Sequence, residues 1–363
     1  MPSLILSFIC SFLATFLIIR SAGKHERLSA DHDLSGPQKF HSRPVPRIGG
    51  ASIVLAVFAA TLATAYWKPP EAAFIGTLVV CGLPAFAAGL VEDLTKNVSP
   101  RRRLFFTAMS AVLAAWLLSA VLVRTAIPGI DALMAWTPFA IALTVLAVAG
   151  TANAVNIIDG FNGLAAMCVL MMVAAIGYVA FQVGDSLLLT AALILAGAVF
   201  GFFLWNFPGG LIFLGDGGAY ILGFMLAEFC VLLITRNSQV SPVFALLLCA
   251  YPIFETVFSI YRKKFLRSMS PGMPDGVHLH MLVYKRLMRL TVTSGSDRRK
   301  TARNSLTSPY LWVLCLLSVI PAVLWWDNTA VLTGFLALFM VSYVLLYWSI
   351  VRFKTPKWLV IRR

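Results

Sequence analysis

Charged side chains are scarce in this sequence of 363 residues. They occupy 12% of the positions, whereas hydrophobic residues occupy 60%, and an average soluble domain has roughly 25% charged residues. A composition this poor in charge excludes an ordinary soluble enzyme. It indicates an integral membrane protein whose chain crosses the bilayer several times.

Two further absences narrow this interpretation. No Cys-x-x-Cys spacing occurs, and the six cysteines fall within apolar stretches, so they resemble small buried hydrophobic residues rather than disulfides or metal ligands. No basic residue precedes the first apolar run, Leu4–Ile19, and Arg20 follows it, which reverses the charge order of a cleavable signal peptide. We expect this run to be a retained span. We find no internal repeat and no soluble domain, so residues 1–363 should form one transmembrane domain.

Eleven apolar runs are long enough to cross about 30 Å of hydrocarbon as helices. They are Leu4–Ile19, Ile48–Tyr66, Ala72–Val91, Leu104–Val123, Pro138–Ile158, Leu164–Val183, Leu187–Trp205, Gly217–Ile234, Val243–Tyr261, Tyr310–Trp326 and Ala330–Val351. The sequence therefore predicts an all-α polytopic integral membrane protein of about eleven transmembrane helices. The longest connection, 262–309, is expected to be a cytoplasmic loop.

Basic residues divide the connections into two sets. One set, with the tail from Arg352, holds 26 of the 29 Lys and Arg, and the other holds only Lys68, Arg124 and Arg236. Because positively charged loops stay in the cytoplasm, the first set should be cytoplasmic, with the N-terminus outside and the C-terminus inside. The net charge of +14 is thus mainly a topology signal, although it would also attract anionic membrane lipids and nucleotide phosphates. We expect no nucleic-acid partner.

One apolar run ends in a group of polar side chains. Within residues 152–163, Ala-Asn-Ala-Val-Asn-Ile-Ile-Asp-Gly-Phe-Asn-Gly, the polar residues recur at every third position: Asn153, Asn156, Asp159 and Asn162. A helix turns about 100° per residue, so neighbours in this series lie on adjacent strips of one surface. Taken alone, an ordinary polar helix end with Asp159 in a turn explains the pattern equally well.

Other carboxylates lie at predicted helix ends on the same side of the membrane. Glu92 and Asp93 end one apolar run, and Asp216 stands among glycines at the start of another. A carboxylate beside hydrocarbon costs a few kcal/mol unless it faces a cavity, a cation or a partner, so these groups could converge with Asp159. The adjacent carboxylates of Glu92 and Asp93 repel each other, which favours a divalent cation beside them. The simpler alternative is that water solvates this pair and nearby basic residues offset its charge. Asp216 could cap its helix, or its glycines could admit a phosphate.

Histidines form a second group of candidates. His278 and His280 are two residues apart and close to Asp275. This spacing suits a metal, a phosphate contact or general acid–base chemistry, and solvated loop histidines are the alternative.

Two carboxylates lie inside predicted helices. Glu255, after Pro252, is close to the cytoplasmic end of its helix, where an isolated carboxylate is costly. Glu228 is deeper, and we expect it to make a helix-packing hydrogen bond. In the first basic loop, Arg43 and Arg47 lie at the level of the lipid headgroups, where phosphate binding and topology anchoring are equally good interpretations.

The order of these motifs resembles the polyprenyl-phosphate N-acetylhexosamine-1-phosphate transferase family. The resemblance is carried by Pro46-Arg-Ile-Gly-Gly, Glu92-Asp93, residues 153–163, Asn206 before Phe213-Leu-Gly-Asp, Pro252-Ile-Phe-Glu and His278-Leu-His. It implies packed transmembrane helices with a cytoplasm-facing active-site cleft. It also implies a UDP-amino-sugar donor, undecaprenyl phosphate as acceptor, and Mg²⁺ as cofactor, with Mn²⁺ as an alternative.

The resemblance also assigns roles to individual residues. It implies that the metal ligands are Asp216, as the main ligand, and Asp159. The implied catalytic residues are Glu92, Asp93, Asp159, Asp216, His278 and His280. The implied substrate-binding residues are Arg43, Arg47, Asn153, Asn156, Asn162, Asn206 and Glu255. Three departures from the usual pattern, Glu92, Asn162 and Met281, suggest a subfamily with an altered sugar or metal preference.

The number of spans favours the WecA-like branch of this family. We therefore expect an enzyme of the bacterial inner membrane that releases UMP and makes the lipid-diphospho-sugar that initiates O-antigen or another surface polysaccharide, with a homodimer as one option. The alternatives are MraY-type transfer of phospho-MurNAc-pentapeptide in peptidoglycan synthesis, a polytopic transporter, and an inactive scaffold of the same fold. Transporter sites tend to lie near the bilayer midplane, whereas these acids gather at one boundary.

Overall fold

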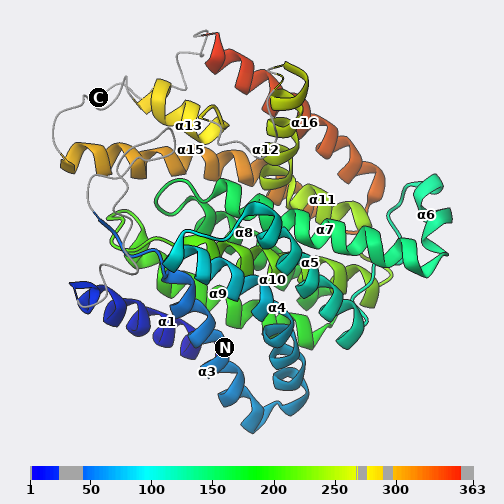
Figure 1. Ribbon diagram of the computed structural model, residues 1–363. Coiled ribbons are helices and arrows are strands. Elements are labelled where there is room, and N and C mark those ends of the chain that lie inside the picture. The colour runs from blue at the N-terminus through cyan, green and yellow to red at the C-terminus, as the bar shows by residue number, and fades with distance from the viewer. Residues whose placement is uncertain (1, 24–43, 267, 269–275, 289–296, 353–363) are drawn as a thin grey trace.

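The computed structural model describes residues 2–23, 44–266, 268, 276–288 and 297–352 (Figure 1). Its helices are α1 (Pro2–Arg20), α3 (Gly49–Trp67), α4 (Pro69–Thr95), α5 (Pro100–Leu117), α6 (Pro128–Met134), α7 (Thr137–Ile158), α8 (Leu164–Gln182), α9 (Ser186–Asn206), α10 (Gly215–Arg236), α11 (Pro242–Leu248), α12 (Ala250–Tyr261), α13 (Leu279–Leu282), α15 (Asp297–Leu324) and α16 (Thr329–Val351), with the π-helical turns η1 (Arg262–Leu266) and η2 (Val283–Leu287). The prediction of an all-α polytopic membrane protein is confirmed.

The number of membrane-spanning helices follows from helix length and composition. Within the described ranges, nine helices are long and apolar enough to cross a membrane, and α11 with α12 and η1 forms a tenth if this pair, bent by 72°, is one span. The fourth predicted run forms α5, which begins with three consecutive arginines after Pro100 and ends at Leu117, short of the expected Val123. The count of eleven stays a prediction.

Helix α10 is the central element of the bundle. Figure 1 shows it in the middle of the molecule, and it packs against α3, α4, α7 and α8. Every residue from Gly215 to Ile234 is buried, as expected for a helix that is apolar on all sides. Close approach at its N-terminus needs glycine on the neighbouring helices, because a Cβ on Gly50 would lie 2.3 Å from the Cα of Gly218 and one on Gly89 would lie 2.4 Å from the N of Gly217.

Helix α1 turns its polar side inward. Its four buried residues are all hydroxyl-bearing (Ser3, Ser7, Ser11 and Thr15). Apart from Pro2 and Arg20 at its two ends, its exposed residues are large and apolar (Ile5, Ile9, Leu13, Phe16 and Leu17). In a bilayer this inversion is favourable, since lipid tails solvate the apolar side while hydroxyl groups bond across helices. Thr15 donates to the Ser52 hydroxyl at 2.7 Å, which ties α1 to α3.

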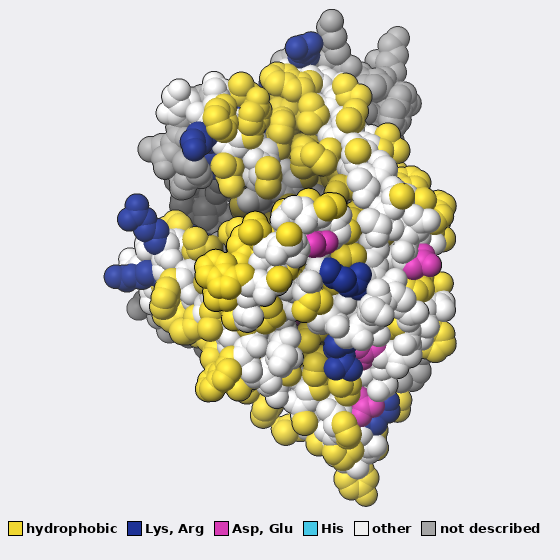
Figure 2. All heavy atoms as spheres, turned by 90° about the vertical axis from the view of Figure 1, so that its right-hand side faces the viewer, with side chains coloured by type: hydrophobic (Ala, Val, Ile, Leu, Met, Phe, Trp, Pro, Cys, Tyr) yellow, Lys and Arg dark blue, Asp and Glu magenta, His cyan; other side chains and the backbone are white. Residues whose placement is uncertain are grey.

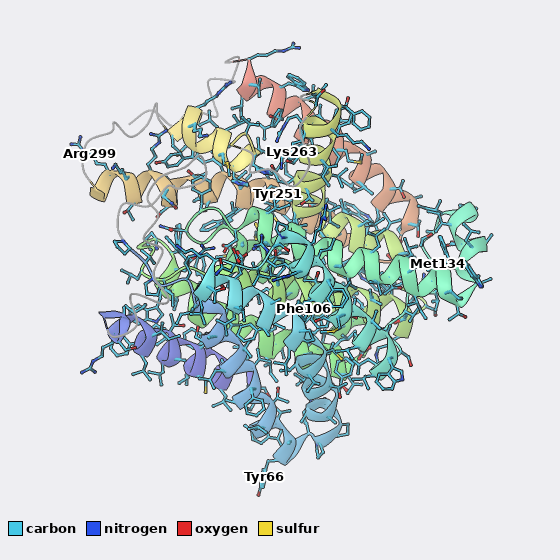
Figure 3. All side chains as sticks on the ribbon, in the orientation of Figure 1. Tyr66, Phe106, Met134, Tyr251, Lys263 and Arg299 are labelled. Atoms are coloured by element: carbon cyan, nitrogen blue, oxygen red, sulfur yellow. The ribbon has the colours of Figure 1, made fainter. Side chains whose placement is uncertain are left out.

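Apolar exposure is general on the outer surface. Figure 2 shows a face on which hydrophobic side chains cover much of the area and charged side chains are few. Tyr66, at the far end of α3, is 91% exposed and points away from the bundle (Figure 3). Apolar patches this extensive mark a surface that contacts membrane or another protein.

All six cysteines are free, and all except Cys10 are buried, which agrees with their interpretation as small hydrophobic residues.

Two expectations about local structure were wrong. The predicted loop 262–309 is shorter, because α15 begins at Asp297 and continues through Pro309. Polar side chains of its first turns pack on the connection that follows α7, as Ser308 shows by donating to the Asn162 carbonyl at 2.6 Å. Glu228 makes no helix-packing hydrogen bond, since both of its buried carboxyl oxygens lack a partner among the described residues.

Candidate active site

The candidate site is built on the N-terminus of α10. Asp93, near the end of α4, accepts hydrogen bonds from the backbone N–H groups of Asp216 and Gly217, both at 2.9 Å. A helix N-terminus leaves its first N–H groups unpaired and carries a partial positive charge, so a carboxylate is well placed there. Gly215 has φ +77°, and a Cβ at this position would lie 1.9 Å from the Arg47 carbonyl oxygen. The two hydrogen bonds hold Asp93 at the N-terminus of α10, and the positive φ and the close approach require glycine at position 215.

The Asp216 carboxylate gathers side chains from three other segments. Its Oδ1 accepts from Asn156 Nδ2 at 3.1 Å and from an Arg47 guanidinium nitrogen at 3.5 Å. Its Oδ2 accepts from Arg103. Arg47 also lies 3.6 Å from Asp93 Oδ1. The structure therefore brings together acids, an amide and two guanidinium groups that are far apart in the sequence.

Arg103 and Tyr220 are site residues that the sequence interpretation missed. Arg103 is the last of three consecutive arginines at the start of α5, and sequence alone gives no reason to select it from the other two. Tyr220 lies one turn after Asp216 on α10 and donates to Asn156 Oδ1 at 3.4 Å. Its spacing of four residues from Asp216 was the one available signal.

Asp159 lies immediately after the last residue of α7. Burial and, to a smaller extent, the charge of Asp216 together raise the pKa of Asp159 to about 7, and Arg47 opposes both effects. No described side chain donates a hydrogen bond to this carboxylate. Asp159 and Asp216 are thus two carboxylates close enough to repel each other, which is a setting that a cation would relieve.

The donor set fits Mg²⁺. No group of three or more His, Cys, Asp and Glu side chains is arranged as a metal cage within the residues that the structure describes. Mg²⁺ does not need one, because it is usually held by one or two carboxylates together with water and substrate phosphates. Asp216 and Asp159 would supply those carboxylates, and Arg103 would leave Asp216 Oδ2 when a cation binds.

Two predicted substrate-binding amides hold loops together instead of facing Asp216. Asn162 Nδ2 donates to the Pro208 carbonyl at 3.3 Å and to Ser305 Oγ at 3.1 Å. Asn206 Oδ1 accepts from the Gly163 N–H at 2.6 Å, and its Nδ2 donates to the Ile212 carbonyl at 2.7 Å. The amides therefore fasten the segment after α7 to the α9–α10 connection and to α15.

Two other predicted residues, Glu92 and Asn153, bond to the backbone close to them in the sequence. Glu92 Oε2 accepts from the Val98 N–H at 2.7 Å, so Glu92 stabilises the α4–α5 connection and makes no hydrogen bond to Asp216. Asn153 donates to the Ala149 carbonyl at 2.7 Å, one turn back on α7. Arg43 lies outside the described residues.

The histidine motif is anchored by Glu255. His278 Nδ1 lies 2.8 Å from Glu255 Oε1, which also accepts from the Leu279 N–H at 3.1 Å. The rings of His278 and His280 are stacked, with centroids 5.3 Å apart and an interplanar angle of 3°. Glu255 thus orients the first histidine, which in turn packs against the second.

His280 connects this motif to the Asp159 segment. A Cβ on Gly160 would lie 3.3 Å from His280 Nε2, and the Phe161 ring meets the imidazole edge-on with centroids 5.7 Å apart. Burial lowers the pKa of His280 to about 3, and the charge of Glu255 opposes this effect only in part. Its two ring nitrogens have no partner among the described residues. His280 is therefore a neutral hydrogen-bonding group at neutral pH.

Comparison with known proteins places this site in a family. The model of glycosyl transferase family 4 matches residues 75–234, which include Asp93, Asp159 and Asp216. A phospho-N-acetylmuramoyl-pentapeptide-transferase of Ruegeria pomeroyi is 30% identical over 64% of this chain and 70% of its own length. The chain therefore belongs to glycosyl transferase family 4.

Other relatives cover more of the chain. A probable undecaprenyl-phosphate N-acetylglucosaminyl 1-phosphate transferase of Bacillus subtilis is 28% identical over 77% of each chain. An undecaprenyl-phosphate alpha-N-acetylglucosaminyl 1-phosphate transferase of Thermotoga maritima is 29% identical over 77% of this chain and 80% of its own length. These alignments extend well beyond the segment that the family model matches.

Proposed function

We propose that this protein transfers an N-acetylhexosamine-1-phosphate from a UDP-sugar to undecaprenyl phosphate at the cytoplasmic side of the bacterial inner membrane. A phosphate oxygen of the lipid attacks the sugar-linked phosphorus of the donor, the bond from that phosphorus to the UMP oxygen breaks, and UMP leaves. The lipid-diphospho-sugar that remains would initiate a surface polysaccharide. The observation that carries the proposal is the group of two carboxylates and two guanidinium groups at the N-terminus of α10, formed by Asp216, Asp159, Arg47 and Arg103.

The charges of this group suit the reaction. Both substrates are anionic, so their approach is opposed by repulsion that cationic groups must reduce. Arg47 and Arg103 can contact phosphates once they leave Asp216, and guanidinium groups match phosphate geometry well. Mg²⁺ held by Asp216 and Asp159 would supply further charge neutralisation at the phosphates. His280 lies against Gly160 and Phe161, immediately after Asp159.

No side chain has to act as a general base. A phosphate monoester has a second pKa of about 6, so the acceptor is largely dianionic at neutral pH and is already nucleophilic. Both oxygens of Asp93 accept backbone hydrogen bonds from α10. Asp93 therefore positions Asp216 by holding the N-terminus of its helix, and it is poorly placed to abstract a proton.

The direct test measures UMP release by the purified protein with undecaprenyl phosphate, Mg²⁺ and UDP-N-acetylglucosamine. We expect Asp216→Asn to abolish turnover. Asp131→Asn is the matched control, because Asp131 bonds to Thr125 in the connection before α6, well away from the site. Wild-type turnover by Asp216→Asn would exclude Asp216 as the metal ligand.

Transfer of phospho-N-acetylmuramoyl-pentapeptide is the second candidate. It is favoured by the identity of 30% to the Ruegeria pomeroyi protein of that name, although the relatives that cover more of the chain are N-acetylglucosaminyl transferases. A panel of UDP-sugars distinguishes the two functions. Release of UMP from UDP-MurNAc-pentapeptide but not from UDP-N-acetylglucosamine would favour the second.

A further inference from the structure

We infer that Tyr343, on α16, is a positioning residue that acts on the histidine motif through Glu255. This inference rests on the proposed function for its activity measurements, but its geometry is independent of the donor sugar. Tyr343 is fully buried, and its hydroxyl donates to Glu255 Oε2 at 2.6 Å. It is the one described side chain that hydrogen-bonds this oxygen.

The hydrogen bonds of Glu255 join three parts of the chain. Glu255 belongs to α12. Its Oε1 accepts from His278, which precedes α13, and from Leu279, the first residue of α13, and its Oε2 accepts from Tyr343 on α16. A carboxylate that has donors on both oxygens has one preferred orientation. Tyr343 therefore sets the plane of the carboxylate, and that plane sets the direction in which Oε1 meets His278 Nδ1.

The orientation of the His278 ring matters because a series of contacts connects His278 to the candidate active site. A hydrogen bond at Nδ1 decides which way the imidazole ring faces and which nitrogen is left for other partners. His278 stacks on His280, which contacts Gly160 and Phe161 immediately after Asp159. Helix α16 contributes no residue to the Asp216 group, yet it is connected to it by this series of contacts.

Replacing Tyr343 by Phe removes the hydroxyl and keeps the packing. The ring meets Phe254 and Phe258 edge-on, with centroids 5.0 and 5.6 Å apart, and Phe can keep both contacts. Tyr251→Phe is a matched control. Tyr251, labelled in Figure 3, is a fully buried tyrosine on the same helix as Glu255, and its hydroxyl has no partner among the described residues.

The test compares UMP release by wild type, Tyr343→Phe and Tyr251→Phe. We expect Tyr343→Phe to lower kcat by about tenfold, as for an interaction between groups of one network, with little change in the KM of either substrate. Tyr251→Phe should match wild type. In a His278→Asn background, Tyr343→Phe should have no further effect, because its target is gone. An unchanged kcat in Tyr343→Phe, or an equal loss of kcat in both backgrounds, would overturn the inference.

A second measurement needs no substrate. Diethyl pyrocarbonate modifies neutral imidazole nitrogens, and mass spectrometry gives the rate at His278. We expect a faster rate in Tyr343→Phe than in wild type and Tyr251→Phe, because the ring is less firmly held. Equal rates in all three proteins would contradict the positioning role. If the wild type releases UMP from no UDP-sugar while the modification rates differ as expected, the proposed function fails and the positioning role stands.

Discussion

The replacement Asn162→Asp tests two roles for the Asn162 side chain. Either it holds neighbouring segments together through hydrogen bonds, or it lies at a position of the metal site where an acid would bind the cation better. Asn162 is one of the three departures from the usual pattern of the family that the motifs resemble, and Asp159 lies three residues before it, so charge alone would suggest that an added acid raises metal affinity. The structure predicts the opposite. Asn162 is 4% exposed, and its Nδ2 donates to the Pro208 carbonyl and to Ser305 Oγ.

A carboxylate at this position cannot donate to Pro208. Two hydrogen bonds at about 1 kcal/mol each are disturbed, and an unpaired buried charge adds to the cost, so we expect a loss of at least about 2 kcal/mol in the free energy of unfolding. Because burial raises the pKa of the new carboxyl in the folded state, the loss should be small near pH 4 and grow as the pH rises through that pKa.

Thermal unfolding in detergent at several pH values, with UMP release measured in parallel, gives the result. Asn328→Asp is the matched control, because Asn328 Oδ1 already accepts the Val331 N–H at the start of α16 and a carboxylate can do the same. If Asn162→Asp unfolds at the same midpoint as the wild type and its activity at low Mg²⁺ is higher, Asn162 does not have the structural role inferred from its hydrogen bonds to Pro208 and Ser305.

Three further predictions concern charge. Because the pKa of Asp159 is about 7, protons compete with a cation for its carboxylate. The apparent affinity for Mg²⁺, measured by titration of UMP release, should therefore be weaker at pH 6 than at pH 8. Equal affinities at the two pH values would argue against Asp159 as a metal ligand. Arg103→Gln should lower kcat by about a hundredfold, as for loss of one charge-stabilising donor, whereas the exposed Arg101→Gln should not. Glu228→Leu should raise the unfolding midpoint, since it removes a buried unpaired group that costs about 1–3 kcal/mol; a lower midpoint would show that Glu228 has a partner.

The sequence predicted the spans and the acids of the site better than it predicted the amides. Apolar runs report burial in lipid directly, and carboxylates are so costly at the membrane boundary that Asp93 and Asp216 attract attention without any knowledge of the fold. An amide carries no such cost. Asn156 and Asn162 belong to one spacing pattern, yet Asn156 contacts Asp216 while Asn162 faces Pro208 and α15.

Long-range partners explain the other differences. The start of α15 was expected to be part of a loop because its sequence is polar and basic. In the structure the polar side chains Asn304 and Ser305 serve as partners for Asn162, so a polar composition here reflects contact with another segment. Arg103 was missed for a similar reason, since its role depends on where α5 lies beside α10.

The charge balance of the site argues for an order of binding. Three carboxylates, on Asp93, Asp159 and Asp216, face two guanidinium groups, on Arg47 and Arg103. With the pKa values of Asp93 and Asp159 both raised to about 7 by burial and by the charge of Asp216, the net charge of this group lies between +1 and −1 at neutral pH, so it attracts a phosphate weakly. A bound Mg²⁺ would make it positive and would also free Arg103 from Asp216. Metal should therefore bind before or together with the UDP-sugar, and the affinity for the UDP-sugar should fall sharply when Mg²⁺ is removed.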